Sequence, residues 1–239
     1  MGRVIVPGDR VQPAPARIYD YLLGGSDNYV VDRAVADQVL VGAPDLRQLA
    51  QANRAFEIRA VRVLAAAGIR QFIDLGTGYP TTPSVHEAAR QQAPSSRVVY
   101  VDNDPVVHVH NTALLAVDDR MASVLADVRQ PEVILDHPDV ARLIDFGQPV
   151  GVLCVAVLHL VPDAAGPGGD HRPVPGPHLR GQLPGAVPVR RRQRPCGGGR
   201  AARGRGGHPV EIPFRSRRQI RGSFGGFELL EPGPADVQD

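Results

Sequence analysis

The sequence predicts an α/β fold in which helices cover both faces of a mostly parallel sheet and a helical extension precedes the sheet. Two observations predict it. Short apolar segments of strand length alternate with helical segments over residues 69–163, which is typical of strands joined by crossover helices. The strand segments are almost continuously apolar, which indicates a sheet buried on both faces and therefore a three-layer sandwich.

The N-terminal extension, residues 1–68, is expected to be helical. A short helix ends at Gly24, a second lies over residues 32–41, and a third runs from the N-cap Asp45 to about Gly68. Apolar residues at three- and four-residue spacing predict the buried stripe of the third helix. They are Leu46, Leu49, Phe56, Ala60 and Leu64.

The central segment, residues 69–163, contains the strands of the predicted sheet. Strands are expected at residues 71–75, 97–102, 123–126 and 150–158. Helices are expected at residues 84–92 and 105–116, with helical turns between residues 131 and 144. Because proline suits the first turn of a helix, Pro105 and Pro131 support two of these starts.

The alternation stops after the fourth strand. Residues 164–211 are expected to be irregular or disordered, because their first 47 residues contain 12 Gly, 8 Pro and 9 Arg with a single acid, Asp170. Residues 212–239 are expected to hold a remnant C-terminal helix, at 213–220, and a strand, at 226–231.

Composition indicates a soluble globular protein with no membrane partner. Hydrophobic residues make up 43% of the chain and charged residues 22%, as in ordinary globular domains. The longest apolar run, residues 150–161, is shorter than the ~20 residues that span a bilayer. The N-terminus lacks the apolar core of a signal peptide, and two cysteines make no disulfide framework. We therefore expect the protein in the cytoplasm.

The arginine-rich tract invites a nucleic-acid interpretation, because clustered cations bind phosphates. The tract contains no aromatic residue on which a base could stack, so we expect no nucleic-acid partner. Its histidines and its cysteine match no regular zinc spacing, so we expect no metal site. These residues are His171, His178, Cys196 and His208.

Acidic residues lie at the ends of the first three predicted strands, at Asp74, Asp102 and Asp127. The carboxyl ends of parallel strands meet at one edge of the sheet, where such folds bind ligands. Directly after Asp74, the turn Gly76-Thr77-Gly78 lets the backbone approach a ligand. Each acid alone could simply cap the next helix, but all three together indicate a binding site.

Charge favours a phosphate-free nucleoside at this site. A dinucleotide would bring pyrophosphate to the glycine turn, where Asp74 would repel it, and Thr81 or Thr82 stands where the third fingerprint glycine should be. S-adenosylmethionine has no phosphate and carries an ammonium and a sulfonium, which a carboxylate attracts. Asp102 would then accept the ribose hydroxyls and Asp127 the adenine amino group. An NAD-dependent oxidoreductase remains the alternative.

Five segments together resemble an actinobacterial family of S-adenosylmethionine-dependent methyltransferases, formerly described as a domain of unknown function and now called the S-adenosyl methyltransferases. The segments are RIYDYLLGGSDN at 17–28, ANRAF at 52–56, QFIDLGTG at 71–78, VYVDNDP at 99–105 and VAVLHLVP at 155–162. Shorter matches lie at 213–217 and 227–233. The resemblance implies a Rossmann-like fold, S-adenosylmethionine as cofactor, and methyl transfer. We expect the unidentified acceptor to be a small molecule.

The resemblance also implies which residues hold the cofactor. The glycine turn and Asp74 would hold its methionine part, Asp102 and Asn103 its ribose, and Asp127 its adenine, while residues 21–29 would close over the site as a lid. The full expected set is Tyr21, Gly24, Gly25, Asn28, Tyr29, Asp74, Gly76, Thr77, Gly78, Asp102, Asn103, Asp127 and Val128. Methyl transfer depends mainly on alignment of the reactants, so no catalytic base is assigned. Asp20 and His159 are the candidates.

Residues 164–211 depart from the family, which should have a helix and a fifth strand there. All 27 basic residues are arginine, which suggests a GC-rich gene, and such a gene read out of frame yields a tract of Gly, Pro, Arg and Ala. We hypothesise one frameshift after Asp163 and a compensating one before Ile212. If neither other reading frame restores a strand and a helix, the hypothesis is wrong. Without a fifth strand, strand four would be an unpaired edge, so an inactive or cofactor-binding-only protein is the competing interpretation.

Overall fold

The computed structural model describes residues 12–115, 118–161 and 185–187. Their strands form one sheet in the order β3-β2-β1-β4-β5, and every neighbouring pair is parallel. The strands are β1 Gln71–Leu75, β2 Arg97–Asp102, β3 Met121–Leu125, β4 Gly151–Val155 and β5 Gly185–Val187. The predicted parallel α/β class is confirmed.

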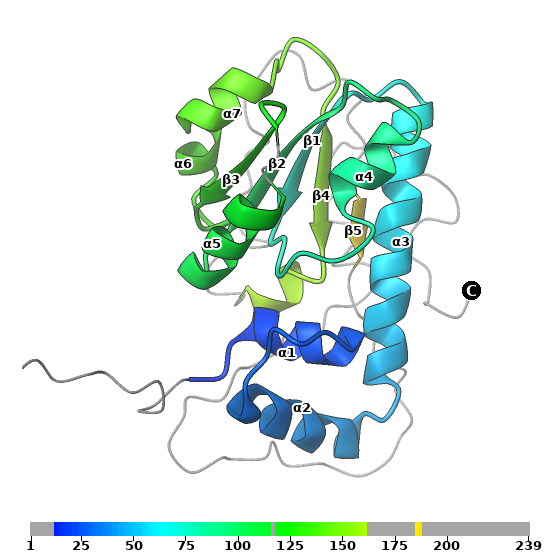
Figure 1. Ribbon diagram of the computed structural model, residues 1–239, viewed down its shortest axis with the longest axis vertical. Helices are drawn as coiled ribbons and strands as arrows, with labels where there is room; N and C mark the ends of the chain where they lie inside the picture. The colour runs from blue at the N-terminus through cyan, green and yellow to red at the C-terminus, as the bar shows by residue number, and fades with distance from the viewer. Residues whose placement is uncertain (1–11, 116–117, 162–184, 188–239) are drawn as a thin grey trace, which may run out of the picture.

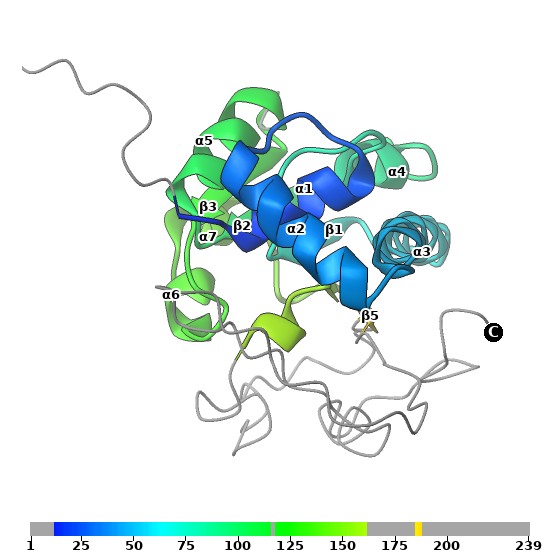
Figure 2. The same cartoon turned by 90° about the horizontal axis from the view of Figure 1, so that it is seen from below.

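Helices cover both faces of the sheet (Figure 2). On one face lie α3 (Leu46–Ala66), α4 (Val85–Arg90) and α5 (Pro105–Leu114), and on the other lie α6 (Pro131–Leu135) and α7 (Pro138–Leu143). Alternate residues of each strand supply the two cores, because successive side chains of a strand point to opposite faces. Phe72 and Val98 pack against α3 and α4, whereas Ile73 and Val99 pack against α6 and α7.

The N-terminal helices α1 (Pro15–Leu23) and α2 (Val30–Gly42) lie beyond the carboxyl ends of the strands (Figure 1). Helix α3 runs beside both this layer and the sheet. The layer has a small core of its own around Leu22, Ala36 and Ala50. The expected N-terminal helical extension is therefore confirmed. None of the helices in the described ranges has the length and apolarity that crossing a membrane requires.

Two predicted details of the elements are wrong. The fourth strand ends at Val155 rather than at residue 158, because Ala156 adopts a left-handed φ of 56° and a 3-10 turn follows at Leu158–Leu160. The predicted stripe of α3 is also wrong at Phe56, which is 37% exposed: Leu64 is buried as expected, but Asn53 and Glu57 are buried in place of Phe56. The predicted stripe assumed that only apolar residues face inward, and α3 instead buries polar groups beside β1.

The expectation of no strand within residues 164–211 is wrong at β5. Residues 185–187 pair with β4 through Leu153↔Gly185, Cys154↔Ala186 and Val155↔Val187, so β4 is not an open edge along those residues. Three residues between two prolines are too few to show a periodic pattern. Their strand conformation is recognised only from the pairing with β4. The rest of residues 164–211 and the helix and strand expected within 212–239 lie outside the described residues. The frameshift stays a hypothesis.

Candidate functional site

The glycine turn follows β1 and is tied to β2. The backbone N–H groups of Gly76 and Thr77 donate to the carbonyl of Val101 at N···O distances of 2.8 and 3.2 Å. Gly76 has a φ of 70°, and a Cβ there would lie 1.8 Å from Val157 Cγ2, so both conformation and space require glycine. Gly78 has a φ of 67°, but a Cβ there would meet no atom within 4 Å. The turn is therefore packed at Gly76 and open at Gly78.

Asp102 joins the end of β2 to this turn. Its Oδ2 accepts from the Gly78 N–H at 2.9 Å, and its Oδ1 accepts from the Asp104 N–H at 3.0 Å. Burial raises the pKa of Asp102, and these two backbone hydrogen bonds oppose the shift. Asn103, the next residue in the chain, has its side chain exposed. The carboxylate is thus held at the tip of β2 by the backbone on both sides of it.

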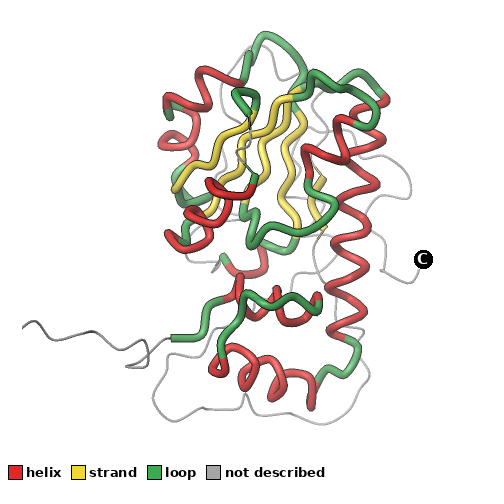
Figure 3. Tube along the Cα trace, in the orientation of Figure 1, coloured by secondary structure: helices red, strands yellow, loops and turns green. Residues whose placement is uncertain are grey.

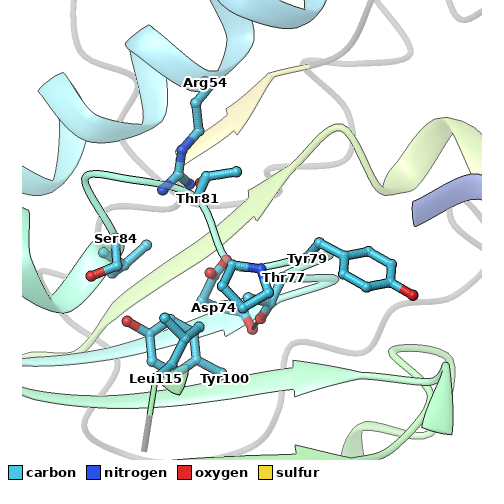
Figure 4. A pocket seen from close by; sticks show the side chains of 10 residues that line it. Arg54, Asp74, Thr77, Tyr79, Thr81, Ser84, Tyr100 and Leu115 are labelled. Atoms are coloured by element: carbon cyan, nitrogen blue, oxygen red, sulfur yellow. Dashed lines mark hydrogen bonds between the residues drawn. The ribbon is translucent and has the colours of Figure 1, made fainter. Parts of the chain in front are cut away.

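Asp74 lies beneath the turn instead of facing an open cleft. Asp74 is 2% exposed, and its carboxyl interacts with Glu57, which is 7% exposed, and with Arg54. Figure 4 shows Asp74 and Arg54 among the residues that line a small pocket beside the turn. Burial raises the pKa of Asp74 well above its usual range, and the nearby Glu57 carboxyl raises it further, while Arg54 opposes both. The expectation of an open negative charge that attracts the ligand therefore needs correction, since this carboxyl binds a proton more readily than a surface carboxyl.

Sequence reasoning missed Arg54 and Glu57. The Arg54 guanidinium donates to Glu57 Oε2 and, through its other terminal nitrogen, to the carbonyl of Pro83, so it joins α3 to the loop before α4. Burial also raises the pKa of Glu57, and Arg54 opposes that shift. Both residues lie inside the segment predicted as the apolar stripe of α3. Arg54 also belongs to the segment ANRAF at 52–56 that carries the family resemblance, and this was the available signal for it.

The end of β3 completes this edge of the sheet (Figure 3). The Ala126 N–H donates to the Asp102 carbonyl at 3.0 Å, which brings the ends of β2 and β3 together. Asp127 follows, and its carboxylate accepts from the Arg129 Nε at 2.9 Å. The Arg129 side chain therefore lowers the pKa of Asp127. Val128 is half-buried beside it.

Asp20, a buried residue of α1, binds the α1–α2 loop through the buried Asn28 and the exposed Gly25. Asn28 Nδ2 donates to Asp20 Oδ2 at 2.8 Å and to the Gly25 carbonyl at 2.9 Å. A Cβ at Gly25 would lie 1.9 Å from Asp20 Oδ1. Gly24 ends α1 with a φ of 87°. These contacts hold the loop in one conformation, and Asp20 takes part in it as an acceptor.

The two tyrosines of the predicted lid point to different places. The Tyr29 ring lies 4.9 Å from the Arg17 guanidinium. The same guanidinium interacts with Tyr79 of the glycine turn, where it opposes the burial that raises the pKa of Tyr79. Tyr21 instead donates to Asp37 Oδ1 at 3.0 Å, and its ring faces the guanidinium of Arg47 at 4.4 Å. Tyr29 therefore lies toward the turn, whereas Tyr21 joins α1 to α2 and α3.

His159 lies in the 3-10 turn that follows β4, where it is half-buried. It is not at the strand end, because β4 stops four residues earlier. Val157 of the same connection packs against Gly76, so this segment is close to the glycine turn. The segment after β4 therefore lies at the carboxyl edge of the sheet, beside the glycine turn.

The helix after the turn does not suit a pyrophosphate. A phosphate would need free N–H groups at the N-terminus of α4. There Ser84 Oγ accepts from the Glu87 N–H at 3.3 Å, and Glu87 Oε2 accepts from the Ser84 N–H at 2.7 Å. This capping box satisfies amide groups and adds a carboxylate at the helix start. The turn and Asp102 fit a phosphate-free nucleoside instead, as in Rossmann-like S-adenosylmethionine-dependent methyltransferases.

Comparison with known proteins identifies the family. The model of the family described as "S-adenosyl methyltransferase" matches residues 7–239, so the chain belongs to that family and S-adenosylmethionine is its cofactor. The chain is 38% identical to a protein from Thermobifida fusca YX that is assigned as a methyltransferase, over 98% of this chain and 92% of that one, with a TM-score of 0.79. It is 36% identical to a DUF574 family protein from Streptomyces avermitilis MA-4680, over 95% and 88% of the two chains, with a TM-score of 0.80.

A search among curated proteins gives no significant match. The family and the two structures confirm the resemblance read from the sequence and the assignment as an S-adenosylmethionine-dependent methyltransferase. Both similar structures come from actinobacteria. Neither the family nor the two structures support the oxidoreductase alternative.

Proposed function

We propose that this methyltransferase acts on a small-molecule acceptor and binds its cofactor across the ends of β1, β2 and β3. The observation that carries the proposal is the bond from the Gly78 N–H to Asp102 Oδ2, at 2.9 Å, beside the open side of Gly78. A ribose held by Asp102 would therefore lie next to the backbone of the turn. The bound cofactor supplies an electrophilic methyl group on a sulfonium.

The proposed contacts follow the order of the strands. Gly76, Thr77 and Gly78 present backbone to the cofactor, Asp102 and Asn103 bind the ribose, and the adenine lies at Asp127 and Val128. The α1–α2 loop closes the site, with Tyr29 on the side of the glycine turn and Gly24, Gly25 and Asn28 shaping the loop. Tyr21 acts indirectly, because its bond to Asp37 holds α1 against α2.

Asp74 has a different proposed role from the one that charge alone suggested. Its buried side chain acts with Glu57 and Thr77 to support the turn, and it influences the cofactor through the shape of that turn. The carboxyl interacts with the Thr77 side chain, and the Thr77 hydroxyl also donates to the Asp74 backbone carbonyl at 3.0 Å, so Asp74 contacts the turn through both groups. We therefore treat Asp74 as a positioning residue.

Methyl transfer requires the acceptor nucleophile, methyl carbon and sulfur to be aligned, so the chain's main task is to hold two reactants and exclude water. Asp20 and His159 remain the candidates for a base. The bond from Asn28 to Asp20 favours a positioning role for Asp20. We also propose a cytoplasmic location and no nucleic-acid partner, as the composition indicates.

Calorimetric titration of the full chain tests the proposal. After a circular dichroism melt has shown cooperative folding, the chain is titrated with S-adenosylmethionine, S-adenosylhomocysteine and NAD. We expect the two sulfur ligands to bind and NAD not to bind. A cooperatively folded chain that binds neither sulfur ligand would contradict the proposal. A screen of small-molecule nucleophiles for S-adenosylhomocysteine release then tests the acceptor class.

A further inference from the structure

An open cleft lies between the α1–α2 loop, helix α3 and residues 80–83. Its volume is about 720 Å³, which suits a small molecule or one end of a larger ligand. One wall carries Arg54, Arg59 and Arg62 of α3, and the facing wall includes Asp27 of the loop. The floor, residues 80–83, continues directly from the glycine turn. A ligand on the turn could therefore extend into this cleft.

The charges that line the cleft are only partly neutralised. Arg54 is bonded to Glu57 and Pro83, and Arg62 donates to Gln91 Oε1 at 3.0 Å. Within the described ranges, Arg59 and Asp27 make no hydrogen bond or ion pair, either with each other or with another residue. The buried Nε of Arg54 also has no hydrogen-bond partner among these residues. One cavity thus holds a free cation on one wall and a free anion on another.

We propose that this cleft binds the α-amino-acid group of a zwitterionic ligand, with the carboxylate at Arg59 and the ammonium at Asp27. Guanidinium and carboxylate groups form the strong charge-assisted hydrogen bonds that such a ligand offers. The inference rests on the proposed function, because the methionine end of the cofactor is one source of this group. An amino-acid acceptor is the other source.

A comparison of two nucleosides measures how much the amino-acid group contributes to the binding affinity. S-adenosylhomocysteine carries it, whereas 5′-methylthioadenosine has the same nucleoside and a thioether without it. We propose calorimetric titration of both into the full chain and into Arg59→Gln and Asp27→Asn. Each variant should bind S-adenosylhomocysteine about tenfold more weakly, as expected for a lost charge-assisted hydrogen bond, and should bind 5′-methylthioadenosine within about twofold of the unaltered chain.

Matched controls remove the same charges elsewhere. Arg142→Gln alters an exposed arginine of α7 on the opposite face of the sheet, and Asp45→Asn alters the exposed residue before α3, whose side chain makes no capping bond. Neither should change the affinity for either nucleoside. Because Arg59 and Asp27 are exposed, their substitution should leave the melting temperature unchanged.

A second titration identifies the source of the group. L-amino acids are titrated into the chain saturated with S-adenosylhomocysteine. Amino-acid binding that Arg59→Gln abolishes, with unchanged affinity for S-adenosylhomocysteine, supports the cleft as the acceptor's subsite. The inference is overturned if the two variants change the affinity for both nucleosides equally. It is also overturned if they change neither affinity and the chain binds no amino acid. If the unaltered, folded chain binds neither nucleoside, the proposed function fails, and titration of L-amino acids into the chain without nucleoside decides this inference.

Discussion

Asp74 and Asp102 belong to neighbouring strands, yet their surroundings differ. Both oxygens of Asp102 accept backbone N–H groups at the rim of the proposed site. Asp74 faces a second carboxyl in the interior, at Glu57. Asp102 therefore holds the backbone at the rim of the proposed site, whereas Asp74 supports the glycine turn from the interior.

The replacement Asp102→Ala tests the ribose contact. It removes two backbone hydrogen bonds and the proposed acceptor of the ribose hydroxyls, so we expect S-adenosylhomocysteine to bind about 10- to 100-fold more weakly. Calorimetric titration measures the change, and Asp136→Ala, at an exposed site after α6, serves as control. Unchanged affinity in a folded Asp102→Ala variant would remove Asp102 from the site.

The raised pKa of Asp74 predicts a pH-dependent stability. Folding favours the protonated carboxyl, so the stabilisation is complete below the unfolded pKa of about 3.9 and is lost as pH rises through the folded value. Asp74→Asn keeps a neutral side chain at every pH. Its melting temperature, relative to that of the unaltered chain, should therefore rise between pH 5 and pH 8. A constant difference across this range would show that Asp74 ionises as freely as an exposed carboxyl.

The two glycines of the turn form a matched pair for a stability test. Both have positive φ, but only Gly76 lacks space for a Cβ. Gly78→Ala should cost about 1–2 kcal/mol for the left-handed conformation, and Gly76→Ala should cost about 1–3 kcal/mol more because Val157 must move. Thermal denaturation followed by circular dichroism measures both. Equal losses would indicate that Val157 yields freely.

Among the elements, α3 connects the most parts of the site. Arg54 reaches the loop before α4, Glu57 lies beside β1, and Ala50 packs in the core of the N-terminal layer. Its buried face therefore has to combine polar and apolar residues. The apolar pattern alone predicted the helix and the burial of Leu64, but it included the exposed Phe56 and left out the buried Asn53 and Glu57.

A pair of alanine replacements tests which face of α3 is buried. Ile58 is 6% exposed and Phe56 is 37% exposed. Ile58→Ala should lower the unfolding free energy by about 2–5 kcal/mol, whereas Phe56→Ala should cost about 1 kcal/mol or less. Urea denaturation measures both. The reverse order would restore the stripe predicted from sequence.

In the whole molecule, the N-terminal layer lies over the strand ends and contacts the glycine turn. Arg17 anchors this arrangement, because its Nε donates to Asp32 Oδ2 at 2.7 Å while its guanidinium faces the Tyr29 ring. At the other side of the sheet, β5 pairs with β4. Both contacts join segments that are distant in the sequence.

The sequence by itself determined the parallel α/β class, the positions of β1 and β2, the glycine turn and the strand-end acids. Hydrophobic period and turn chemistry are local, so they can be read from consecutive residues. Only the tertiary structure decided that Glu57 faces Asp74, that Tyr29 rather than Tyr21 approaches the turn, and that residues 185–187 complete the sheet. Such pairings depend on how separate elements pack, and a polar residue in an apolar stripe acquires its role only from the partner it meets.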